Sequence, residues 1–455
     1  MPVHPIEFRY YSDEMRNIFT EEHKLQTWLD VEAALAKAHA QVGNIPVKAA
    51  KEIAEKATTK LVKLERVKEI DKEIHHDLMA MVKAFSEVCG DEVAGYIHLG
   101  ATSYDIEDTA LTLQLRDALG ILRKDLLTLR EVLMKLAEDH KNTICIGRTH
   151  GQQALPYTYG MKFATWANEI DRHIDRLKEC KERILVGKMS GAVGTMAGFD
   201  KQGFKIQELV MDHLKLKPSE ITNQVIQRDR HAELLSLLAL IAASLNKFAK
   251  EIRNLQRTEI AEVFEPFKKG QVGSSTMPHK RNPHKTERIC GLYRIVASNV
   301  FPALENVALE HERDITNSSA ERIIIPEGFI VLDYMLKQMI SILKGLEFNY
   351  ENIERNLNLT RGLILAERVM IELVKKGIGR QEAHEILRQS AIRSSKEGIE
   401  LKQILAIHPA VSEVASKKEL DDWLDPRNYI GTAVEQVERV LEYLETKRRL
   451  GGKRP

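Results

Sequence analysis

The feature that most constrains the fold is a long segment without proline in which leucine recurs at helical spacing. Between residues 108 and 140, leucines follow one another at intervals of three and four residues: Leu111, Leu115, Leu119, Leu122, Leu126, Leu129, Leu133 and Leu136. Side chains at this spacing lie on one face of an α-helix. At ~1.5 Å per residue, the segment predicts a helix on the order of 50 Å long.

Other segments repeat the helical pattern. The first contains Leu25, Trp28, Leu29, Leu35 and Ala36 and stops at the breaker of residues 43–46; the others span residues 161–185, 229–263, 284–308 and 327–346. Segment 229–263 is apolar over much of its circumference, so other helices must surround it, at the centre of a bundle or at a subunit interface. Strand signals are nearly absent. We therefore predict an all-α fold with a central bundle of long helices.

The length of the chain indicates several domains. Its 455 residues exceed the ~250–300 residues at which single cores stop growing. Beyond Tyr350 the helical segments shorten, and turn signals return at Gly377, Pro409 and Pro426. We predict an N-terminal helical domain of residues 1–103, a central bundle of residues 104–352 and a C-terminal helical domain of residues 353–455. Helices this long exceed what a monomer needs to bury its own core, so we expect an oligomer.

Composition excludes several classes of protein. The 67 Lys and Arg residues nearly balance 66 Asp and Glu residues, which leaves no global charge to attract nucleic acid or a membrane. The apolar run at residues 234–245 is shorter than the ~20 residues of a membrane span, and residues 1–5 lack the pattern of a secretory leader. The four cysteines form no Cys-x-x-Cys pair, which favours buried, reduced thiols. We expect a cytoplasmic protein with no nucleic-acid or membrane partner.

Four irregular polar segments interrupt the helices, at residues 98–105, 147–152, 270–282 and 312–322. Loops on a rigid scaffold often carry chemistry. In the third, the small residues Gly273, Ser274 and Ser275 predict a loop that a ligand would order, and Lys280 and Asn282 add a cation and an amide. Composition alone equally suits a flexible basic surface loop. A Walker phosphate loop is excluded by the absence of its pattern, and a nucleic-acid patch lacks interleaved aromatic residues.

Histidines supply the other candidates. His150 follows Thr149 between two glycines, and an isolated histidine is either structural or catalytic. His75, His76 and Asp77 form a cluster, but no His-Glu-x-x-His pattern accompanies it. We therefore expect no metal site.

Residues 273–283 read Gly-Ser-Ser-Thr-Met-Pro-His-Lys-Arg-Asn-Pro and closely resemble the signature of the fumarase/aspartase superfamily of lyases. The segments Thr102-Ser103 and Thr149-His150 precede it in the expected order. Over nearly its whole length the chain resembles the branch that cleaves succinylated purine nucleotides; the residues that carry this are Arg9-Tyr10, His76-Asp77, Gln224 and those in 312–322. The resemblance implies a three-domain, all-α fold, elimination of fumarate, and no cofactor.

The resemblance also implies roles for individual residues. Ser274 matches the general base, His150 the general acid, and Lys280 and Asn282 the groups that stabilise the carbanion, which is delocalised into its neighbouring carboxylate. Glu287 would pair with an active-site histidine. His76, which would lie near the reacting succinyl group, is a further implied catalytic residue. The implied substrate-binding residues are His75, Asp77, Thr102, Ser103, Gln224 and Ser275.

A nucleotide also requires a phosphate site. The matching residues are Arg9, Tyr10, Arg313, Ser318 and Arg322, because arginine offers forked, permanently charged donors. An alternative for Arg313 and Arg322 is an ion pair with Glu312, Asp314 or Glu321. Many relatives carry Lys or Arg where this chain has His75, so any phosphate contact there would depend on pH.

Members of the superfamily assemble as homotetramers whose active sites combine residues from three subunits, and the resemblance implies the same here. Two other interpretations stay open. One is another lyase that shares the loop but not the nucleotide, such as argininosuccinate lyase or a cycloisomerase. The other is a helical scaffold that kept the fold without the activity.

Overall fold

The computed structural model describes residues 3–267, 276–277 and 279–451, and they are mostly helical. The chain divides into two compact units, each built from three stretches of sequence. The first unit comprises residues 1–127, 173–246 and 289–338, and the second comprises residues 128–172, 247–288 and 339–455. The all-α fold class predicted from the sequence is confirmed. The three predicted domain boundaries stay a prediction.

Five long helices carry residues of both units: α7 (Ser103–Asp139), α8 (Tyr159–Ile184), α10 (Asp229–Leu255), α11 (His284–Ser298) and α13 (Thr316–Lys344). Helix α7 confirms the leucine pattern, since Leu115, Leu119, Leu122 and Leu126 are fully buried. Among the described residues, α10 alone is long and apolar enough to cross a membrane, but 61% of its apolar window is buried, as in a core helix.

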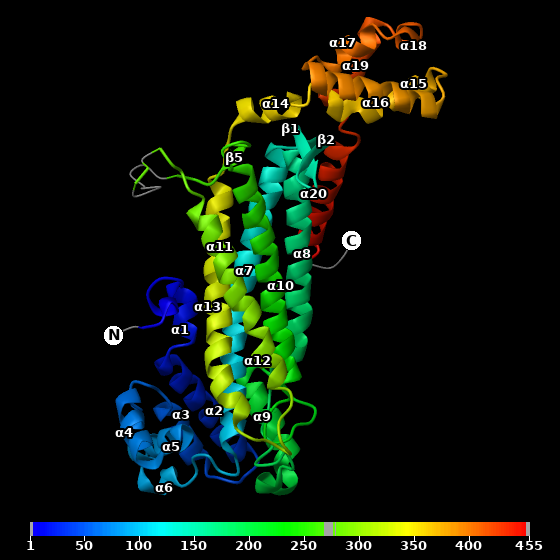
Figure 1. Cartoon of the computed structure of the whole chain (residues 1–455). Coiled ribbons are helices and arrows are strands. Elements are labelled where there is room, and N and C mark those ends of the chain that lie inside the picture. The colour runs from blue at the N-terminus through cyan, green and yellow to red at the C-terminus, as the bar shows by residue number, and fades with distance from the viewer. Residues whose placement is uncertain (1–2, 268–275, 278, 452–455) are drawn as a thin grey trace. The chain divides into compact units, whose positions relative to one another are not determined.

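The first unit adds a cluster of shorter helices near the N-terminus (Figure 1). They are η1 (Pro5–Glu7), α1 (Asp13–Ile18), α2 (Glu21–Gln41), α3 (Val47–Lys56), α4 (Leu64–Ile74), α5 (Asp77–Val88) and α6 (Asp91–Ala94). Later in the chain come β3 (Val186–Gly187), η2 (Ala197–Gln202), α9 (Gly203–Leu214), β4 (Lys217–Pro218) and α12 (Val300–Glu305); β3 and β4 pair in parallel. One hydrophobic core joins α2, α5, the start of α7 and α9 through residues such as Leu29, Phe85, Ile106 and Ile206.

The second unit contains an antiparallel hairpin, β1 (Ile144–Thr149) and β2 (Gln152–Thr158), and a short pair, β5 (Val263–Phe264) and β6 (Glu347–Phe348). Its remaining helices are α14 (Tyr350–Asn358), η3 (Leu363–Leu365), α15 (Ala366–Lys375), α16 (Arg380–Glu397), α17 (Leu401–Ala406), α18 (Pro409–Ser412), α19 (Lys417–Trp423), η4 (Pro426–Asn428) and α20 (Ala433–Arg449). Helices α15 to α19 share a core that includes Leu373, Leu387, Leu401 and Trp423 (Figure 1).

Several helix ends differ from the prediction for identifiable reasons. Helix α10 ends at Leu255, not near residue 263, because Ala261 turns the backbone to φ 50° and the Glu262 N–H donates to the Leu255 carbonyl. Predicted helix 284–308 divides into α11 and α12, because Pro302 has no N–H to donate to the Ser298 carbonyl.

Helix α13 begins eleven residues before the predicted Glu327. The Asp314 carboxylate accepts the Thr316 N–H at 2.7 Å, which satisfies a backbone donor in the first turn. The helix also contains Pro326 in its interior. Ser318 and Arg322 therefore lie on a helix and not in the irregular segment predicted at residues 312–322.

All four cysteines are free thiols, as predicted. Cys89, Cys145 and Cys180 are buried, whereas Cys290 is partly exposed. Burial raises the pKa of Cys145 to about 12, which makes this thiol inert at neutral pH.

Two glycines allow a test of the backbone near residue 190. Both Gly191 (φ 79°) and Gly194 (φ 88°) adopt a left-handed conformation, but only at Gly194 would an added Cβ collide with a neighbour, the Thr222 carbonyl oxygen. Gly191→Ala should cost about 1–2 kcal/mol, the usual cost of a left-handed L-residue, and Gly194→Ala should cost clearly more. Chemical denaturation of both variants measures the difference. Equal losses would show that the close approach to Thr222 does not constrain the fold.

Candidate active site

The largest group of predicted substrate-binding residues lines one cavity of the first unit. The cavity has a volume of about 520 Å³. Helices α2 and α4, the turn before α5, the first two turns of α7 and α13, and the loop before α13 form its wall. The predicted residues in this wall are His75, His76, Asp77, Ser103, Arg313, Ser318 and Arg322. Residues far apart in the sequence thus meet in one polar pocket.

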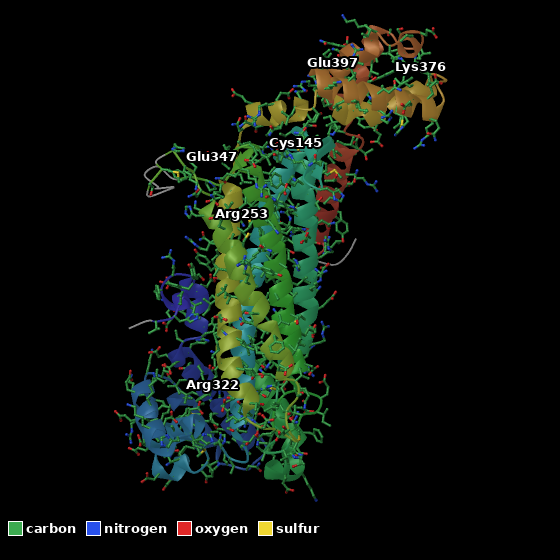
Figure 2. All side chains as sticks on the ribbon, viewed as in Figure 1. Cys145, Arg253, Arg322, Glu347, Lys376 and Glu397 are labelled. Carbon is green, nitrogen blue, oxygen red and sulfur yellow. The ribbon has the colours of Figure 1, made fainter. Side chains whose placement is uncertain are left out.

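Arg322 is the central cation of this pocket. It lies on the early part of α13 (Figure 2), and its Nη2 donates to Asp77 Oδ2 at 2.7 Å. Glu107 Oε2 lies 3.7 Å from the same nitrogen. Burial acts to lower the pKa of Arg322, but the bond to Asp77 and the two acids outweigh it, so that this pKa is raised. The guanidinium stays charged and is held in place by carboxylates.

Lys24 is a second cation in the wall. Its Nζ lies 3.9 Å from Asp77 Oδ2 and 4.4 Å from the centre of the Trp28 ring. Burial, followed by the charge of Arg322, lowers the pKa of Lys24. An anion that entered the cavity would meet both cations.

Arg313 approaches the cavity from the loop before α13. Its guanidinium carbon lies 3.7 Å from the centre of the Tyr104 ring, and its Nη1 donates to Gln224 Oε1 at 2.8 Å. Burial raises the pKa of Tyr104 to about 12, and the Tyr104 side chain is hydrogen-bonded to Ser318. Tyr104 therefore joins Arg313 to Ser318. Neither Arg313 nor Arg322 forms an ion pair with Glu312, Asp314 or Glu321. The ion-pair partners considered for these arginines in the sequence analysis are therefore wrong.

A buried ionic network lies next to the pocket. The Arg228 guanidinium donates to both carboxylate oxygens of Asp108 at 2.8 Å and to Glu321 at 3.1 and 3.2 Å. His231 Nδ1 lies 3.2 Å from Glu321 Oε1. Asp108 adjoins Glu107 on α7 and Glu321 adjoins Arg322 on α13. The network thus fixes both helices directly beside the pocket.

The two adjacent histidines occupy a sharp turn between helices. His75 ends α4 with φ 52°, a left-handed conformation. His76 caps α5, and its Nδ1 accepts the Met79 N–H at 3.4 Å. Because Nδ1 is an acceptor, a neutral His76 carries its proton on Nε2, where it is available to a ligand.

In the second unit, His150 lies at the exposed tip of the hairpin. Thr149 pairs with Gln152, so His150 (φ 53°) and Gly151 (φ 75°) form a two-residue turn. Such turns require positive φ at both positions. Glu262 anchors the hairpin from within: it accepts hydrogen bonds from Arg148, Tyr159 and Asn356. The hairpin was not predicted from the sequence.

The end of the signature segment adjoins the start of α11. Glu265 accepts the N–H groups of Lys285 and Thr286 at 3.2 and 3.0 Å, and Gln256 Nε2 donates to the Arg281 carbonyl at 2.9 Å. These bonds fix the chain next to Asn282, which is half-buried, while Lys280 is exposed.

The remaining predicted site residues lie outside this cavity or outside the described residues. Ser274 and Ser275 lie outside the described residues. Glu287, predicted to pair with a histidine, has Arg253 Nη2 at 4.0 Å in its own unit (Figure 2 labels Arg253). Arg9 and Tyr10 do not line the cavity; Arg9 Nε donates to the Tyr10 hydroxyl at 3.2 Å, and Tyr10 packs on Tyr334. The Thr102 N–H donates to Asp105 at 2.9 Å, just before the cavity-lining Ser103.

Sequence reasoning missed Lys24, Tyr104 and Glu107. A signal was present, because Ser103 and Glu107 are four residues apart on one helix face, as are Lys24 and Trp28. As for metals, among the described residues no cluster of three or more His, Cys, Asp or Glu side chains has the geometry to hold an ion.

Comparison with known proteins agrees with this architecture. Residues 7–301 match the family described as Lyase, and residues 362–440 match the one described as Adenylosuccinate lyase C-terminus. The adenylosuccinate lyase of Pyrococcus abyssi (strain GE5 / Orsay) is 59% identical, over 99% of this chain and 100% of the relative. That of Methanocaldococcus jannaschii is 52% identical, over 98% and 97%. Among solved structures, fumarate lyase from Mesorhizobium sp. BNC1 has a TM-score of 0.89 at 34% identity, covering 97% of this chain and 100% of its own.

The helical fold and these matches define a lyase of the fumarase/aspartase superfamily, which confirms the resemblance found in the signature segment. Within that class the chain belongs to the adenylosuccinate lyase family, a family of carbon–nitrogen lyases.

Proposed function

We propose that this enzyme eliminates fumarate from adenylosuccinate to give AMP, and from succinylaminoimidazole-carboxamide ribotide to give the carboxamide ribotide, in purine nucleotide biosynthesis. The observation that carries the proposal is the cavity in which Arg313, Ser318 and Arg322 meet His76. Such a wall suits a ligand with several anionic groups. The similarity to relatives named adenylosuccinate lyase also supports this substrate.

In this proposal the cavity binds the substrate. Arg313, Ser318 and Arg322 receive the phosphate in this cavity. Arg9 and Tyr10, which do not line it, stay predicted phosphate-binding residues. His76 lies against the succinyl group and offers its Nε2 proton, while Asp77, Thr102, Ser103, Gln224 and Ser275 complete the polar surroundings. His75 replaces the permanent cation of many relatives, so its share of phosphate binding would depend on pH.

The proton transfers are assigned to residues of the second unit. Ser274 removes the proton from the carbon beside a carboxylate, and His150 protonates the departing nitrogen. Lys280 and Asn282 stabilise the negative charge that develops on that carboxylate. Glu287 would pair with an active-site histidine and raise its proton affinity. No metal or organic cofactor is part of this scheme.

We also propose a cytoplasmic homotetramer whose active sites combine three subunits. Large exposed apolar side chains on α12 and α13, among them Phe301 and Ile323 at 70% and 65% exposure, support an interface between copies. A fully active monomeric particle would contradict this assembly.

The direct test is to incubate the purified enzyme with adenylosuccinate and follow AMP and fumarate. Calorimetry with AMP measures nucleotide binding independently of turnover. Release of both products, with AMP binding, supports the proposal. An enzyme that fails on adenylosuccinate but releases fumarate from argininosuccinate would overturn the nucleotide assignment within the same superfamily, and loss of both activities would favour a non-catalytic scaffold.

A further inference from the structure

Glu107 is an acid inside the cavity that the proposed mechanism does not use. It lies on the second turn of α7, and its side chain is only 14% exposed. Among the residues that the structure describes, its charged contact is Arg322 Nη2 at 3.7 Å, whereas Asp77 holds the same nitrogen at 2.7 Å. Asp77 also has Lys24 within 3.9 Å. Asp77 and Glu107 therefore compete for the same cations, and Glu107 forms the longer, weaker contact with Arg322.

Charged groups of several helices act on Glu107. They are Asp77 on α5, Lys24 on α2, Arg322 on α13 and Asp108 on α7 itself. The other titratable groups in the cavity wall are Glu21, Lys68, Asp71, His75, His76, Tyr104 and Arg313. Burial, and next the charge of Asp77, raise the pKa of Glu107 to about 7. At neutral pH this carboxyl therefore exchanges readily between its charged and neutral forms.

An anion bound at Arg322 would change this balance. It would add negative charge beside Glu107 and draw the guanidinium and the Lys24 ammonium toward itself. Both changes disfavour the charged form of Glu107. A neutral carboxylic acid, in contrast, no longer competes with the ligand for Arg322, which Asp77 continues to hold, and it can still hydrogen-bond within the pocket.

We propose that Glu107 is a positioning residue that holds Arg322 in the empty pocket and takes up a proton when an anionic oxygen group of the substrate binds that arginine. The inference rests on the proposed function, because it takes the substrate to be the ligand. The anionic group is either the nucleotide phosphate or a succinyl carboxylate.

Calorimetry at pH 7 tests this. AMP, which carries only the phosphate, and fumarate, which carries only carboxylates, are titrated separately into the enzyme in two buffers of different ionisation enthalpy. The difference in heat gives the protons taken up per site. Because about half of the sites are charged near the pKa, we expect an uptake of up to ~0.5 proton with the ligand that binds Arg322, and much less with the other.

Variants separate this role from a structural one. Glu107→Gln should lose the uptake seen in the wild type, Glu107→Asp should restore part of it, and Glu92→Gln, an exposed acid of the same unit, should leave it unchanged. Above pH 7 the wild-type dissociation constant should rise by up to about tenfold per pH unit, while that of Glu107→Gln should stay flatter.

The outcomes distinguish the two proposals. If neither AMP nor fumarate binds, the proposed function fails first. If every ligand that binds the wild type does so without proton uptake at pH 7, or if folded Glu107→Gln shows the wild-type uptake, the role of Glu107 is overturned while the proposed function stands. The wild-type measurement decides the matter even if a variant does not fold.

Discussion

His150→Asn should lower the turnover of adenylosuccinate by about 100-fold or more at neutral pH, since general acid–base catalysis typically contributes 10²–10⁴-fold. Asparagine suits the hairpin turn because it tolerates positive φ, so the variant keeps the backbone at φ 53° and removes only the imidazole. The binding of AMP should change little. Steady-state kinetics gives kcat and KM separately, and a fall in kcat with nearly constant KM indicates a group that acts in the transition state.

Two further variants serve as comparisons for His150→Asn. Ser274→Ala should show a loss of similar size if the serine is the base, and His384→Ala, an exposed histidine of the second unit, should leave kcat unchanged. Full activity of His150→Asn would remove His150 from the mechanism and return it to its alternative as a structural turn residue.

Arg228→Ala should be the most destabilising of the substitutions considered. Arg228 is 2% exposed and forms charge-assisted hydrogen bonds to Asp108 and Glu321. Its removal leaves two buried carboxylates without their cation, and breaking a buried pair in this way costs about 3–5 kcal/mol. Thermal and denaturant unfolding measure the loss. Arg388→Ala breaks an exposed pair with Glu385 and should barely change the melting temperature.

The same network predicts a response to acid. Burial alone would raise the pKa of Glu321, but His231, Arg228 and Asn317 outweigh it and lower this pKa to about 2. Since the folded-state value lies below the unfolded one, the stabilisation is complete above the unfolded pKa of ~4.3 and is lost as pH falls toward about 2. A wild-type protein with unchanged stability across this range, or an Arg228→Ala variant as stable as wild type, would contradict the assignment.

Local patterns in the sequence predicted the long helices well. The leucines of α7 sit at a period that only a helix satisfies, and the structure buries them. Helix ends were less predictable, because they depend on single contacts, such as the bond from Thr316 to Asp314 that starts α13. The hairpin around His150 was missed because Pro156 interrupts the strand pattern of β2 and because the turn is an unusual His-Gly pair.

The cavity illustrates what a motif resemblance can and cannot supply. Arg313, Ser318 and Arg322 were identified through residues that match a family. Lys24 and Glu107 belong to no such motif. Helical spacing places Glu107 on the same face as Ser103, but the packing of α2 against α7 and α13 is what brings both residues into one pocket with Arg322. The pKa of Glu107 likewise depends on burial and on Asp77, neither of which a linear sequence displays.

Pro326 weakens the backbone connection between the start of α13 and the remainder of the helix. A proline in a helix has no N–H to donate to the carbonyl four residues earlier, and for Pro326 that carbonyl belongs to Arg322. The turns that carry Ser318 and Arg322 are therefore joined to the remainder of the helix by a weakened link. The buried salt bridge between Glu321 and Arg228, which lies between Ser318 and Arg322 along the helix, therefore replaces the missing backbone bond in holding these turns in place.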